Sequence, residues 1–90
     1  MPRYLVETYL GRTQSAERTA REERARSAAA DLTRERALVH FDHSIHVPED
    51  EICFYVFEAG SAADAEDAAN RAGLGPIRVV EAIASQKEET

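Results

Sequence analysis

The three histidines of this 90-residue chain all lie in one short stretch, VHFDHSIHV at residues 39–47. Imidazole binds transition metals and exchanges a proton near neutral pH, so the stretch is the first candidate for chemistry. Its β-branched and aromatic residues are typical of a strand, in which successive side chains point to opposite faces of a sheet. The alternation places His43 on one face together with three apolar residues: Val39, Phe41 and Ile45.

His40 and His46 are expected on the opposite face, roughly 20 Å apart, where they cannot share an ion within one chain. We expect both to be solvated. An imidazole among apolar neighbours is either a core residue, bonded to a backbone carbonyl or to Tyr55, or part of a pocket. Folding the following hairpin places His43 opposite Tyr55 or Cys53, although a register slip of one residue would change these neighbours.

Three glutamates, Glu7, Glu58 and Glu81, sit inside or at the end of apolar runs. Burying an unpaired carboxylate costs several kcal/mol, so each is expected to face solvent or a partner. If they shared a pocket with His43, their oxygens and its nitrogen would suit a divalent transition metal. Cys53 is expected to pack as a small apolar residue. The chain has no zinc-finger, phosphate-loop or nucleophile-elbow motif.

The elements that would position these residues follow from local patterns. Strands are predicted at 3–10, 37–47, 51–59 and 77–83, and helices at 15–33 and 61–72. Ser15 and Ser61 are the expected helix caps, and Gly73 suits a left-handed C-terminal cap. The apolar stripes of the two helices consist of Ala25, Ala28, Ala29 and Leu32 in the first and Ala62, Ala65, Ala69 and Ala72 in the second.

The order β-α-β-β-α-β predicts an α+β, ferredoxin-like domain over residues 1–84, followed by a flexible tail at 85–90. Two helices would cover one face of a four-stranded antiparallel sheet. The other face would remain open, and an open apolar sheet face usually marks an interface or a ligand site. We therefore expect a homodimer.

Composition narrows the class of protein. The net charge is -6; residues 1–36 carry 8 basic and 6 acidic side chains, and residues 37–90 carry 3 and 11. This acidic balance argues against nucleic-acid binding, which needs surplus basic groups. The sequence has neither an apolar run long enough to span a membrane nor a signal-peptide core, and its single cysteine suits a reducing compartment. A cytoplasmic location is expected.

Several segments together resemble a family of small ferredoxin-like domains that are often labelled nickel-binding proteins. They are RYLVETYL, HS with VPEDE, CFYVFEAGS, and RAGL before IRVVEAI. The resemblance covers Arg3 to Ile83 and implies a homodimer that binds Ni²⁺. It also implies that His43, Glu7 and Glu58 are the ligands. The chain departs from the family at Ile45 and Ala68, where many relatives have tyrosine and histidine.

Three functions are compatible with these features. The first is a small dimeric protein that binds nickel or a similar ion through His43, Glu7 and Glu58. The second is an enzyme or binding protein for a small hydrophobic molecule, with a pocket around Phe41, Tyr55, Cys53 and Glu81 and with Phe54 and Phe57 lining it. Here His43 and Tyr55 would exchange protons, but no pair has a spacing diagnostic of catalysis. The third is a protein-interaction module.

Overall fold

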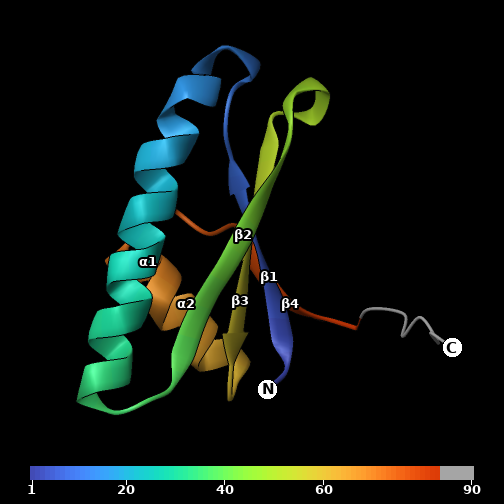
Figure 1. Ribbon diagram of the computed structural model, residues 1–90. Helices are drawn as coiled ribbons and strands as arrows, with labels where there is room; N and C mark the ends of the chain where they lie inside the picture. The colour runs from blue at the N-terminus through green and yellow to red at the C-terminus, as the bar shows by residue number, and fades with distance from the viewer. Residues whose placement is uncertain (84–90) are drawn as a thin grey trace, which may run out of the picture.

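The computed structural model describes residues 1–83 and has the element order β-α-β-β-α-β. The strands are β1 (Arg3–Tyr9), β2 (Val39–Val47), β3 (Ile52–Ala59) and β4 (Arg78–Ala82). The helices are α1 (Arg18–Glu35) and α2 (Ala62–Arg71), with 3-10 turns η1 (Arg12–Glu17) and η2 (Pro48–Asp50). The sheet is antiparallel in the order β2-β3-β1-β4, with both helices on one side (Figure 1). The predicted ferredoxin-like α+β fold is confirmed; the expected tail at 85–90 lies outside the described residues.

The core lies between the helices and the sheet. In α1 the buried side chains are those of the predicted stripe, Ala25, Ala28, Ala29 and Leu32. In α2, Ala68 is buried with Ala65 and Ala69, whereas Ala62 is exposed. Such small side chains let the helices approach the sheet closely. The sheet supplies the bulk, including Phe41 and Phe57, whose rings meet edge to face with centroids 5.4 Å apart.

The helix ends agree with the sequence at α2 but not at α1. The Ser61 hydroxyl accepts a hydrogen bond from the Asp64 N–H at 3.2 Å, and Gly73 has the left-handed φ of 69°. Ser15, by contrast, lies within η1, where Gln14 has non-helical angles, and α1 begins only after Glu17. The prediction of a Ser15 cap is therefore wrong.

Strand β2 contains a β-bulge at Asp42. Phe41 pairs with Phe57 and His43 pairs with Val56, so Asp42 is an extra residue without a partner of its own. An extra residue reverses the alternation of all side chains that follow it. Consequently Ser44 is buried against α1, whereas His43 is exposed on the face without helices. The predicted sharing of a face by His43 and Phe41, and the predicted pairing with Tyr55 or Cys53, are wrong for this reason. The prediction that His40 lies on the face opposite His43 is wrong too, because His40 pairs with Glu58 on the face without helices; only His46 lies opposite His43.

Three backbone groups of β2 form hydrogen bonds with side chains of α1. The Thr33 hydroxyl donates to the Val39 carbonyl at 2.9 Å and accepts from the Val39 N–H at 3.0 Å. Further along the strand, the Arg18 guanidinium donates to the Ser44 carbonyl at 3.3 Å. These contacts attach α1 to β2 near both ends of the helix.

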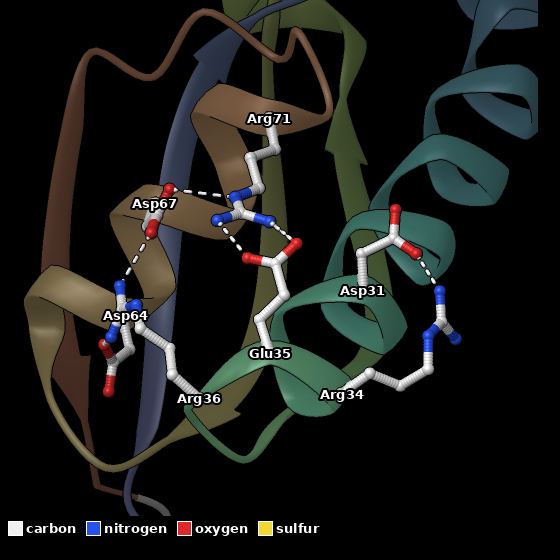
Figure 2. A network of polar contacts seen from close by, with 7 residues as sticks. All are labelled: Asp31, Arg34, Glu35, Arg36, Asp64, Asp67 and Arg71. Carbon is white, nitrogen blue, oxygen red and sulfur yellow. Dashed lines mark hydrogen bonds and ion pairs between the residues drawn. The ribbon is translucent and has the colours of Figure 1, made fainter.

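Ion pairs connect the end of α1 to α2, as Figure 2 shows. Arg71 donates to both carboxylate oxygens of Glu35, at 2.8 and 2.9 Å, and also to Asp67. Arg36 donates to Asp64 and Asp67. The hydrogen bond from Arg71 lowers the pKa of Glu35. These groups are solvent-exposed, so the network orients the two helices without dominating stability.

The bulge predicts an unusual tolerance to deletion. Removing Asp42 restores a regular strand and leaves Phe41, His43 and Ser44 on the faces they already occupy. We expect this deletion to lower the free energy of unfolding by roughly 1–2 kcal/mol, in the range of ordinary substitutions. Urea unfolding followed by circular dichroism would measure it.

Deleting Ile45 is the matched control. It removes one residue from the regular part of β2 and misplaces the side chains on one side of the gap. We expect it to cost about 4 kcal/mol or more, in the range typical of core disruption. Equal costs for the two deletions would contradict the assignment of Asp42 as the extra residue.

Candidate functional site

The face of the sheet that carries no helix is apolar at its centre and charged around it. Leu5 on β1 lies between Val56 on β3 and Val80 on β4, and the neighbouring row pairs Phe54 with Ile45. Ile45 is 45% exposed although it is a large apolar residue. We call these five residues, together with the side chains that surround them on this face, the open face.

His43 lies on the open face beside carboxylates. Its side chain is 56% exposed, and its Nδ1 lies 3.4 Å from an Asp42 oxygen. Arg3 bridges Asp42 and Glu58, with its Nε at 3.9 and 3.4 Å from their oxygens. This contact is an ion-pair distance rather than one of the hydrogen bonds of the structure. It leaves Nε2 free, and a carboxylate beside the ring nitrogen that does not bind the ion is common in protein metal sites. The sequence reasoning missed Asp42, because simple alternation placed it on the face opposite His43.

Glu7 lies on the same face but not in the same place. It belongs to β1, which is separated from β2 by β3, so its backbone lies at least about 10 Å from that of His43. Its carboxylate is paired with Arg78 at 3.2 Å. Within residues 1–83, no three His, Cys, Asp or Glu side chains are grouped so as to hold a metal ion. The donors in this described part of one chain therefore do not form a complete site by themselves.

Glu81 is exposed and pairs across the sheet with Tyr4. It borders an open hollow of about 460 Å³ at the end of the sheet, together with Glu58 and Arg3. Glu7 does not line this hollow. Glu58 and Glu81 thus border the same hollow, but their strand partners, Arg3 and Tyr4, place them on opposite faces of the sheet, and Glu7 lies apart from both.

The remaining predicted pocket residues lie on the other face, beneath the helices. Phe41, Tyr55 and Cys53 are buried there, with the rings of Phe41 and Tyr55 6.3 Å apart. His43 cannot act with Tyr55, because the bulge directs it to the open face. Phe54 also lies on the open face, so the predicted aromatic pocket does not form as a unit.

Tyr55 is the one residue in the described part of the chain whose buried side-chain polar atom has no hydrogen-bond partner. The residue is fully buried, and burial raises the pKa of its hydroxyl. Burial likewise raises the pKa of the Cys53 thiol, which keeps it protonated and unreactive while it is covered. Beside it, the Thr8 hydroxyl donates to the Cys53 carbonyl at 2.9 Å.

Comparisons with known proteins support the fold. No family model matches the chain, and no curated protein is similar to it. Among solved structures, the chain is similar to the crystal structure of SCO4226 from Streptomyces coelicolor A3(2), with a TM-score of 0.76 and 16% identity. The match covers 93% of this chain and 99% of that one. In residues 1–83, no helix has the length and apolar character needed to cross a bilayer.

The unpartnered hydroxyl predicts the behaviour of a Tyr55→Phe variant. Removing a buried hydroxyl that lacks a partner removes a desolvation cost, so the free energy of unfolding at pH 7 should stay equal or rise by up to about 1 kcal/mol. The folded state raises the pKa of Tyr55. The contribution of this residue to the free energy of unfolding is therefore fully present below the unfolded pKa of about 10 and is lost as the pH rises above it.

The phenylalanine variant should lose less stability than wild type between about pH 9 and pH 11. Urea midpoints measured across this range would show the difference. Tyr9→Phe is the control, because Tyr9 is 55% exposed. Identical alkaline profiles for wild type and Tyr55→Phe would contradict the burial of the Tyr55 hydroxyl.

Proposed function

We propose that the protein is a small homodimer that binds a divalent transition-metal ion at the open face, with His43 as its nitrogen ligand. The observation that carries the proposal is the placement of His43 Nδ1 3.4 Å from Asp42, which leaves Nε2 for an ion. Glu58 lies on the adjacent strand of the same face and adds a carboxylate. Mixed nitrogen and oxygen donors suit nickel, copper or zinc better than manganese or iron.

A second copy is part of this proposal because residues 1–83 of one chain do not bring three donors together. Packing two open faces against each other would bring donors of both chains into one space, Glu7 among them. The chain measures 38 × 34 × 19 Å, so its broad side offers on the order of 1,000 Å², enough for a standard interface of about 800 Å² per partner. The charges of the face are already paired within the chain, Arg3 with Glu58 and Arg78 with Glu7, which lowers the cost of covering them.

Calorimetric titration of tag-free protein with Ni²⁺ tests the metal site. Wild type should bind, and His43→Ala should bind at least about 100-fold more weakly because it lacks the nitrogen donor. Asp42→Asn, which weakens the orientation of the ring, should lose about 10-fold. His46→Ala is the control, since His46 lies on the helix-covered face near the Leu10 carbonyl. Indistinguishable titrations of wild type and His43→Ala would refute the site.

Sedimentation equilibrium tests the dimer separately. Wild type should have twice the 10.0 kDa mass of the chain, whereas Ile45→Lys should be monomeric because it places a charge in the apolar centre of the open face. Leu38→Lys is the matched control, since Leu38 is 64% exposed but precedes β2. A monomeric wild type, or a dimer that tolerates Ile45→Lys, would place the association elsewhere or exclude it.

A further inference from the structure

The two halves of the segment formed by η1 and α1 are held against the sheet by different kinds of contact. From Ala25 onward, α1 buries four apolar side chains. The preceding stretch, residues 12–24, buries none, although it continues along the same side of the sheet. Figure 1 shows this stretch at the end of the sheet where the β2–β3 hairpin turns. Segments with few buried apolar contacts open most readily in folded proteins.

Polar contacts hold this stretch, and Ser44 is their centre. The Ser44 hydroxyl accepts from Arg18 Nε at 2.8 Å and donates to the carboxylate of Glu22. A further hydrogen bond runs from Arg21 to the Tyr9 carbonyl at 3.1 Å. Near η1, the Arg12 N–H donates to a carboxylate oxygen of Glu51 at 3.2 Å. Each of these bonds can be exchanged for a bond to water when the stretch lifts.

The sheet beneath this stretch is closed to solvent and partly polar. Tyr55, Cys53 and Thr8 are each 0% exposed. Ser44, which bonds to Arg18 and Glu22, pairs with Tyr55 across the β2–β3 ladder, so these two side chains meet the sheet next to Tyr55. The unpartnered Tyr55 hydroxyl belongs to the same surface. The Tyr55 hydroxyl is thus buried without a hydrogen bond at the border of the core, beside a stretch that has no buried apolar side chain of its own.

We propose that residues 12–24 form a lid that opens while the rest of the domain stays folded, exposing the surface that carries the Tyr55 hydroxyl and the Cys53 thiol. The hinge is the turn of α1 at Ala25, where apolar anchoring begins. The latch is Ser44, which joins Arg18 and Glu22 to β2.

The reactivity of Cys53 with a disulfide reagent such as DTNB reports the opening, because Cys53 is the only cysteine in the chain. In chelator-containing buffer, wild-type labelling should depend only weakly on urea below the unfolding transition, since lid opening exposes little surface. Ser44→Ala should label at least about 10-fold faster. Thr33→Val, which removes two comparable hydrogen bonds at the other end of α1, should label within about threefold of wild type.

The proposal would be overturned if the labelling rate rose with urea concentration as steeply as global unfolding does in all three proteins. If Ser44→Ala does not fold, hydrogen exchange on wild type decides the question. Amides of residues 21–24 should then exchange at least about 10-fold faster than those of residues 29–32. Equal protection of the two sets would exclude an independent lid.

Discussion

One extra residue in β2 determines the two faces of this protein. Asp42 has no partner on β3, and its presence directs His43 outward and Ser44 inward. The outward turn places an imidazole beside a carboxylate on the face without helices. The inward turn gives α1 a hydroxyl to which Arg18 and Glu22 attach. Both the proposed metal site and the proposed latch depend on this one irregularity of the backbone.

The space between the helices and the sheet is divided along its length. At one end, the aromatic rings of Phe41 and Phe57 meet the alanine stripe and Leu32 of α1. At the other end, Arg18 and Glu22 bond to Ser44, which pairs with Tyr55. Apolar burial contributes most of the stability of a small domain, so the first end holds the fold together. The second end contributes less to stability, so residues 12–24 can open there while the rest of the domain stays folded.

Much of the fold could be predicted from the sequence because its signals are local. Alternating strands, the Ser61 cap, Gly73 and the alanine stripes each act within a few residues. The bulge could not be predicted, because it depends on which residues of β3 pair with β2. The start of α1 was also misplaced, since residues 12–17 contain no inward apolar side chain to fix a helical register.

The candidate site was predicted only as a set of residue types. His43, Glu7 and Glu58 do share the open face, but the reasoning that gave His43 an apolar environment was wrong. Distances across strands depend on strand order, which places β3 between β2 and β1 and so separates Glu7 from His43. Asp42 carried no sequence signal beyond its position next to a histidine.

The bonds from Thr33 and Arg18 to β2 have a consequence for how copies of the chain can associate. Unsatisfied backbone groups along a terminal strand act as a template onto which further chains add, and such growth leads to fibrils. Here α1 occupies part of that template, and the bulge interrupts it further. At the opposite border, β4 offers only five residues. Open-ended growth of the sheet is therefore disfavoured, and closed, finite assemblies built through its broad side are favoured.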